Sequence, residues 1–222
     1  MTEKERARAR DIAQRHLATG DALGWFEALY AQAAGDATII PWADLMPNQN
    51  VIQWLEQHQV AGAGREALKI GCGLGDDAEE LARRGFRTTA FDISASAIAW
   101  CRRRFPQSPA MYVVADLFRA PIEWRGKFTF VLESYTLQVL PPSLRREAIN
   151  HIASFVTPRG TLLVVSRGRE PDEPQGEMPW PLMKDELTDF LRLGLKEVGF
   201  EDYLDDEDPP VRRFRVAYRR ER

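Results

Sequence analysis

The sequence is poor in cysteine and histidine, which limits the chemistry that it can support. The 222 residues include 2 cysteines and 3 histidines. Cys72 and Cys101 lie far apart and belong to no CxxC pair, so neither a disulfide framework nor a structural zinc site is expected. The histidines, His16, His58 and His151, fall in no motif. We therefore predict no bound metal.

An excess of positive charge and long apolar runs are also missing. Lys and Arg number 30 against 33 Asp and Glu, which gives a formal net charge of -3 and does not favour nucleic-acid binding. No stretch approaches the ~20 apolar residues of a membrane-spanning helix. Basic residues such as Arg6 and Arg10 interrupt the N-terminal segment, which has no apolar signal core. We expect a cytoplasmic protein without nucleic-acid or membrane partners.

The apolar residues, 44% of the chain, suffice for one cored domain with room for a cap. Apolar residues at helical spacing predict helices within 2–34, interrupted at 19–21, and a third helix over 48–58. Two prolines between them predict an ordered loop at 39–48. We predict a helical cap or lid over residues 1–62, followed by the main domain over 63–222.

Beyond the cap, short apolar runs alternate with helical patterns, which is typical of a mostly parallel sheet covered by helices. The predicted strands are 67–71, 87–92, 110–115, 128–133 and 161–165. The predicted helices are 76–84, 94–105, 143–156 and 184–198. The fold class is therefore α/β.

The last thirty residues break this alternation. Apolar patterns at 200–204 and 213–218 predict two strands whose connection is too short for a parallel crossover, so we expect an antiparallel hairpin. Six acids between Glu201 and Asp208 precede six arginines between Arg212 and Arg222. We favour cross-strand ion pairs over the alternative, an RNA-binding tail.

The most informative stretch is a strand followed by the turn Gly71-Cys72-Gly73-Leu74-Gly75 and the start of a helix. Such a turn lets a ligand approach backbone that side chains would otherwise cover. Asp92 ends the second predicted strand about twenty residues later, where a carboxylate can accept hydrogen bonds from both ribose hydroxyls. The alternative is that Asp92 caps the next helix, although Ser94 already fits that role.

The acids that follow the turn distinguish two adenosine cofactors. Asp76 and Asp77 stand where the pyrophosphate of NAD would rest on the helix N-terminus, and they would repel it. They agree with the positive charges of S-adenosylmethionine. The alternatives are that both acids only cap the helix, or that the chain is an NAD-dependent dehydrogenase.

These residues resemble the motifs of class I S-adenosylmethionine-dependent methyltransferases. The glycine turn is similar to their first motif, Asp92 to their second-strand acid and Val114-Ala115-Asp116-Leu117 to their third-strand acidic motif. The resemblance covers residues 65 to 218 and implies a Rossmann-like, mostly parallel sheet of seven strands with a C-terminal antiparallel hairpin. Lys69 departs from it, because the family usually has an acid there. Anchoring of the methionine ammonium then falls to turn carbonyls or to Asp76.

The resemblance also implies an adenine site. Asp116 would accept a hydrogen bond from the adenine amine, Leu117 and Phe118 would pack near the ring, and Ile93 would cover its other face. The alternative for Asp116 is a plain turn residue at a strand end. Cys72 fills space in the turn without a catalytic role. The predicted cofactor-binding residues are Trp42, Gly71, Cys72, Gly73, Gly75, Asp76, Asp92, Ile93, Asp116, Leu117, Phe118 and Glu133.

The acceptor is expected beyond the carboxyl ends of the fourth and fifth strands. There Glu133 would lie beside the methionine end of the cofactor. The alternative is that it has only a structural role in the turn. Arg167 and Arg169 would clamp an anionic substrate, or form surface ion pairs. Met178 and Trp180 would form a lid wall. The predicted substrate-binding residues are Trp42, Met46, Tyr135, Arg167, Arg169 and Trp180, and the predicted catalytic residues are Asp44, Glu133 and Tyr135.

The start of the N-terminal loop, Pro41-Trp42, resembles the entry segment of the thiopurine and thiol methyltransferase branch, although residues 43–46 depart from it. We therefore expect methyl transfer to a small molecule, with a thiol or another soft nucleophile as acceptor. A hydroxyl acceptor would need a base, and Asp44 or Glu133 is the candidate. The alternatives are an O- or N-methyltransferase of a metabolite and a non-catalytic nucleotide-binding module. The sequence does not predict an oligomeric state.

Overall fold

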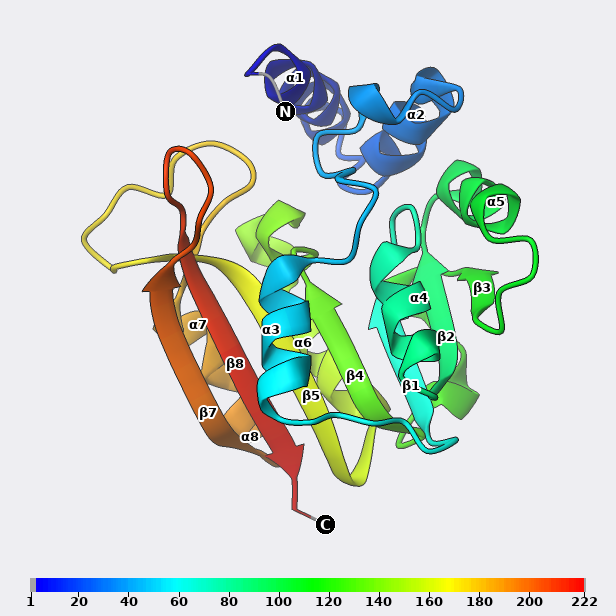
Figure 1. Cartoon of the computed structure of the whole chain (residues 1–222). Helices are drawn as coiled ribbons and strands as arrows, with labels where there is room; N and C mark the ends of the chain where they lie inside the picture. The colour runs from blue at the N-terminus through cyan, green and yellow to red at the C-terminus, as the bar shows by residue number, and fades with distance from the viewer. Residues whose placement is uncertain (1–2, 222) are drawn as a thin grey trace.

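The computed structural model describes residues 3–221 and contains one sheet with the strand order β3-β2-β1-β4-β5-β8-β7 (Figure 1). Strands β1 to β5 are parallel, and β8 runs antiparallel between β5 and β7. This confirms the α/β fold class with a C-terminal antiparallel pair. The strands are β1 (Glu66–Ile70), β2 (Arg87–Asp92), β3 (Met111–Val114), β4 (Phe128–Ser134), β5 (Val156–Arg169), β6 (Leu182–Met183), β7 (Leu195–Leu204) and β8 (Arg212–Arg220). The two-residue β6, which pairs with β5, was not predicted.

Helices cover both faces of the sheet because its central strands are apolar on both sides. One face packs against α3, through Val51, Trp54 and Leu55, and against α4. The other face packs against α6, α7 and α8. The helices are α1 (Glu3–Ala18), α2 (Gly24–Ala33), α3 (Gln49–Gln57), α4 (Asp76–Arg83), α5 (Ala95–Arg104), α6 (Pro142–Phe155), α7 (Lys184–Leu187) and α8 (Asp189–Arg192).

The N-terminal helices divide into two groups. Helices α1 and α2 lie beyond the ends of the strands, at the top of Figure 1, whereas α3 lies along the sheet. Trp54 of α3 shares a buried cluster with Phe130 and Leu163 of the sheet. Only α1 and α2, with the loop that follows them, therefore stand where a cap would be, and the boundary at residue 62 stays a prediction.

The predicted helix over 184–198 is wrong in its second half. Helix α8 ends at Arg192, Gly194 adopts a left-handed φ of 79°, and β7 begins at Leu195. A glycine in this conformation ends a helix without steric cost. Residues 195–204 then pair with β8 along their whole length, which satisfies the backbone groups that a longer helix would have paired.

The ion pairs predicted for the C-terminal hairpin are confirmed. Arg212 lies 2.5 Å from Asp202, and Arg215 lies 2.5 Å from Glu201. Arg213 pairs with Asp205 at 2.5 Å. Three of the arginines thus pair with acids that precede them in the sequence.

Residues 3–221 contain no membrane-spanning helix, metal-ligand cluster or disulfide. None of their helices has both the length and the apolar character to cross a bilayer. No group of three or more His, Cys, Asp or Glu side chains within this range is arranged to hold a metal ion. Cys72 and Cys101 are buried and form no disulfide.

Candidate functional site

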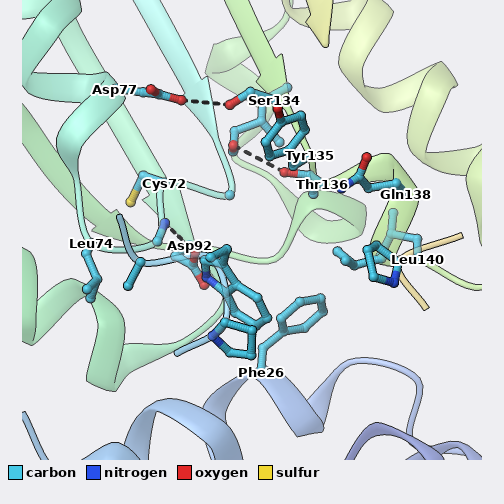
Figure 2. A pocket seen from close by; sticks show the side chains of 18 of the residues that line it. Phe26, Cys72, Leu74, Asp77, Asp92, Ser134, Tyr135, Thr136, Gln138 and Leu140 are labelled. Atoms are coloured by element: carbon cyan, nitrogen blue, oxygen red, sulfur yellow. Dashed lines mark hydrogen bonds between the residues drawn. The ribbon is translucent and has the colours of Figure 1, made fainter. Parts of the chain in front are cut away.

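A cavity of about 260 Å³ opens at the carboxyl ends of β1, β2 and β4 (Figure 2). Its walls come from the glycine turn after β1, from the loops after β2, β3 and β4, and from α1, α2 and the loop before α3. Ligands of open α/β sheets gather at this edge. The cavity therefore lies where the sequence predicted the site.

The glycine turn forms the floor of the cavity. Gly71, Gly73 and Gly75 have φ values of 54°, 53° and 95°. A Cβ at Gly71 would lie 2.5 Å from the Thr136 hydroxyl, and one at Gly73 would lie 3.1 Å from the Tyr30 hydroxyl. The turn thus requires glycine for its conformation and for the close approach of the neighbouring side chains.

Asp92 holds this turn in place. One carboxylate oxygen accepts a hydrogen bond from the Gly73 amide at 2.9 Å, and the other accepts one from the Ser94 amide at 3.0 Å. Burial raises the pKa of Asp92 although these bonds oppose it. Ser94, and not Asp92, caps α5, because its hydroxyl accepts a bond from the Ala97 amide at 3.0 Å. The helix-cap alternative for Asp92 is thus wrong, and its role at the ribose stays a prediction.

The acids after the turn line the cavity, but both have partners that the sequence did not predict. Asp76 forms a two-fold contact with Arg104 of α5, at 2.7 and 2.8 Å. Asp77 accepts hydrogen bonds from the Asn48 amide at 2.8 Å and the Ser134 hydroxyl at 2.7 Å. Their charges are therefore partly balanced within the chain, and the predicted repulsion of a pyrophosphate is weaker than the sequence alone indicated.

Lys69 is a buried cation beneath the turn. Its ammonium donates to the Ile70 carbonyl at 2.8 Å and lies 3.7 Å from Asp77. Its charge also acts on the carboxyl groups of Asp92 and Glu133, whose pKa values it lowers against the larger effect of burial. One lysine thus balances several buried acids where the family usually has an acid.

The residues predicted at the adenine lie together on one wall. Ile93, Asp116, Leu117 and Phe118 all line the cavity. Asp116 also accepts a hydrogen bond from the Phe118 amide at 2.9 Å and so begins the turn at Leu117–Arg119. The turn role of Asp116 is confirmed, and the adenine contacts stay predictions.

Glu133 lies behind the cavity wall and does not line it. One of its oxygens accepts hydrogen bonds from the amides of Thr136 at 2.7 Å and Leu137 at 2.9 Å, and the other is buried without a hydrogen-bond partner among residues 3–221. Burial raises the pKa of Glu133 to about 7. The structure thus places Glu133 in the turn role that was the alternative to a place at the cofactor.

Tyr135 and Trp42 lie on the cavity wall, as predicted. The Tyr135 hydroxyl accepts a hydrogen bond from the Asn50 side chain at 2.9 Å. The Trp42 indole donates to the Tyr30 hydroxyl at 2.8 Å and so ties the N-terminal loop to α2. No sequence motif predicted Tyr30 as a site residue, because its position in the pattern is that of an ordinary apolar helix residue.

Asp44 and Met46 lie at the solvent-exposed mouth of the cavity. Partial burial and the nearby charge of Glu207 raise the pKa of Asp44. A carboxyl group with a raised pKa is a better proton acceptor than an ordinary one. Asp44 is therefore the one predicted carboxylate base that reaches the cavity.

Two predicted substrate-binding residues lie elsewhere. Arg169 donates to the carbonyls of Glu170 at 3.0 Å and Glu173 at 2.8 Å, outside the cavity. Trp180 packs against the cluster around α2 and is not part of the lining. Arg167 and Met178 do line the cavity. Arg167 and Arg169 share a face of β5 because they lie two residues apart, but the strand ends at Arg169, whose side chain binds carbonyls of the loop that follows.

Glu27 fixes α2 to the start of α5. Its carboxylate accepts hydrogen bonds from the hydroxyls of Ser94 at 2.7 Å and Ser96 at 2.6 Å, and from the Ser96 amide at 3.1 Å. Burial opposes these bonds, but together they outweigh it and lower the pKa of Glu27. The cap is thus attached directly beside Asp92, and no sequence signal had indicated this contact.

This attachment leads to a testable expectation. Glu27→Ala removes the three bonds and frees α2, with Tyr30, from the turn, so we expect S-adenosylhomocysteine to bind about three- to tenfold more weakly. Calorimetry measures the change, and Glu56→Ala, an exposed acid on α3, is the control. Equal affinity of the two variants would show that α2 does not shape the site.

Comparisons with known proteins agree with this geometry. Residues 67–160 match a family model described as a methyltransferase domain. An uncharacterized methyltransferase from Mycobacterium tuberculosis is 35% identical over 99 residues, which cover 45% of this chain and 49% of that protein. The chain thus spans about half the length of the curated relatives it matches.

Two solved structures resemble the whole fold more broadly. The 1,6-didemethyltoxoflavin-N1-methyltransferase from Burkholderia thailandensis, with bound S-adenosylhomocysteine, has a TM-score of 0.69 at 15% identity over 88% of this chain and 87% of that one. The N-methyltransferase NodS from Bradyrhizobium japonicum, also with S-adenosylhomocysteine, has a TM-score of 0.69 at 20% identity over 88% and 97%.

Residues 67–160 are thus similar to a methyltransferase domain, and the solved structures share the fold predicted for the whole chain. The solved neighbours hold S-adenosylhomocysteine, which is consistent with the predicted cofactor, S-adenosylmethionine. The thiopurine and thiol branch, and the acceptor, stay predictions.

Proposed function

We propose that the chain binds S-adenosylmethionine in the cavity and transfers its methyl group to a small-molecule acceptor. The observation that carries the proposal is that the glycine turn and Asp92 meet at the floor of one continuous cavity, whose wall includes Trp42 and Tyr135. When bound, the cofactor supplies a methyl group on a cationic sulfur. The residues of the chain orient it and the acceptor.

The residues present fit this cofactor. Asp92 is a buried carboxylate at the cavity floor, and each of its oxygens retains acceptor capacity for a ribose hydroxyl. The backbone of the turn is not covered by side chains of its own, because Gly71 and Gly73 have none. Asp116 and its neighbours stand on the wall where the adenine would pack.

Binding measurements separate this proposal from the NAD-dependent alternative. We expect S-adenosylhomocysteine to bind with clear heat release and NADH to bind at least tenfold more weakly. Asp76 and Asp77 lie in the first turn of α4, where a pyrophosphate would rest, and their charges are only partly balanced by Arg104, Asn48 and Ser134. Tight NADH binding without affinity for S-adenosylhomocysteine would reverse the assignment.

We also propose the type of nucleophile on the acceptor. We favour a thiol or another soft nucleophile, because such an acceptor needs no base. The aromatic wall of Trp42 and Tyr135 would exclude water from it. The two solved structures described above are of N-methyltransferases, which supports testing amines beside thiols and phenols. Binding of the cofactor without methylation of any acceptor would favour the non-catalytic module.

Asp44→Asn distinguishes a hydroxyl acceptor from a thiol. A hydroxyl needs a base in the transition state and a thiolate does not, so we expect the ratio of phenol to thiol turnover to fall about ten- to a hundredfold. The rates of product formation with a matched phenol and thiophenol give this ratio directly. A constant ratio would exclude Asp44 as the base.

A further inference from the structure

Two arginines face each other at the acceptor end of the cavity. Arg167 on β5 and Arg213 on β8 are direct partners in the antiparallel ladder, and both line the cavity. Like charges directly opposite each other on a sheet are destabilising. Each arginine of the pair therefore needs an anion as a partner.

Arg213 contacts two anions of the chain directly, whereas Glu207 acts on Arg167 through its charge alone, without a hydrogen bond or ion pair among residues 3–221. Arg213 is 1% exposed, pairs with Asp205 at 2.5 Å and with Glu207, and lies over the Tyr135 ring at 4.7 Å. These contacts occupy Nε and one of the two terminal nitrogens of its guanidinium. Arg213 is thus a neutralised part of the wall.

Arg167 has no such partner. Its backbone amide donates to the Gln138 side chain at 2.7 Å, but no hydrogen bond or ion pair reaches its guanidinium from residues 3–221, and its Nε is buried without an acceptor. Burial and the charge of Arg213 lower the pKa of Arg167. A partly buried cation in this state is costly unless an anion joins it.

We propose that the methyl acceptor carries a carboxylate that pairs with Arg167. This inference rests on the proposed function and names the acceptor class for the same cavity. A guanidinium offers a planar pair of donors that matches a carboxylate in a two-fold contact. Apolar side chains around it, Tyr135 and Met178, would hold the organic body of the acceptor.

The charges at this end favour a single negative charge. Glu207 and Asp44 also line the cavity there, and Glu207 is already paired with Arg213. A phosphate dianion would meet both carboxylates, whereas a single carboxylate is balanced by the Arg167 guanidinium. Arg6, which also lines the cavity, lies 3.8 Å from Glu207. The site thus fits an organic monoanion.

Benzoate and the neutral benzamide, of similar shape, are suitable probes. We expect calorimetry on the protein loaded with S-adenosylhomocysteine to show benzoate binding at least tenfold more tightly than benzamide. Arg167→Met should abolish this preference, and Arg167→Lys should retain part of it. The control is Arg219→Met, an exposed arginine at the far end of β8, which should keep the full preference.

The outcomes separate the inference from the function on which it rests. Equal affinity for the two probes, or a preference that persists in Arg167→Met, would overturn the inference. So would a loss of S-adenosylhomocysteine binding in Arg167→Met without any benzoate preference in the wild type, because Arg167 would then pair with the cofactor. If S-adenosylhomocysteine fails to bind the wild type, the proposed function fails, and the same probes on the free protein still decide the role of Arg167.

Discussion

Asp92→Ala is expected to weaken S-adenosylhomocysteine binding by about 30- to 1000-fold, which corresponds to ~2 to 4 kcal/mol. A carboxylate that accepts from two ribose hydroxyls makes two charge-assisted hydrogen bonds, and the substitution removes both. Asp92 also accepts from the Gly73 amide, so its loss loosens the turn on which the cofactor would lie. Calorimetry at neutral pH measures the effect.

Two further variants separate binding from folding. Asp92→Asn retains an oxygen for one of the Gly73 and Ser94 amides and places its NH2 group against the other, so it should lose less stability than Asp92→Ala and still bind weakly. Asp36→Asn changes an exposed carboxylate that caps the Thr38 amide at 3.0 Å and should bind as the wild type does. An unchanged affinity in Asp92→Ala would remove Asp92 from the binding site.

Local patterns predicted the frame of the molecule well. Strand β2 has the predicted bounds, 87–92, and β1, β3 and β4 differ by about one residue at their ends. This accuracy follows from short apolar runs, which are buried on both faces in β1 and β4, and from the glycine-rich turn that ends β1. The glycine turn and Asp92 meet because parallel strands place their carboxyl ends at one edge.

The sequence did not predict the contacts between distant segments. Arg104 neutralises Asp76 from another helix, and Glu27 reaches Ser94 from the cap, 67 residues earlier in the chain. No pattern encodes which of many charged residues will meet. The same limit explains the error at 184–198, where pairing of β7 with β8 outweighed the helical propensity of the segment.

Glu133 shows most clearly how burial changes the role of a residue. Its type and its place at the end of β4 predicted a group at the cofactor, but its side chain is buried and does not line the cavity. It accepts instead from the two amides of its own turn. Its chemistry is therefore that of a buried acid, which has consequences for stability.

Glu133→Gln is expected to make the free energy of unfolding fall less steeply as the pH rises. The pKa of Glu133 is raised to about 7 from its ordinary value of 4.5, with burial as the largest cause. Between these values the folded state binds more protons than the unfolded state, so stability falls as pH rises. The difference between the two pKa values corresponds to at most about 3 kcal/mol of stability. The wild type loses this stability between pH 4.5 and 7, and the variant shows no such loss.

Urea unfolding of both proteins at pH 4, 6 and 8 tests this expectation. Gln retains an oxygen for the Thr136 and Leu137 amides but carries no charge, so its free energy of unfolding relative to the wild type should increase steadily from pH 4 to pH 8. Asp92 titrates in both proteins, and its contribution cancels in the difference. Glu56→Gln, with an exposed acid, should show no such trend. A constant difference in free energy of unfolding at all three pH values would mean that Glu133 is not the buried acid described. A large loss of S-adenosylhomocysteine affinity in Glu133→Gln at pH 6 would instead mean that Glu133 contacts the cofactor.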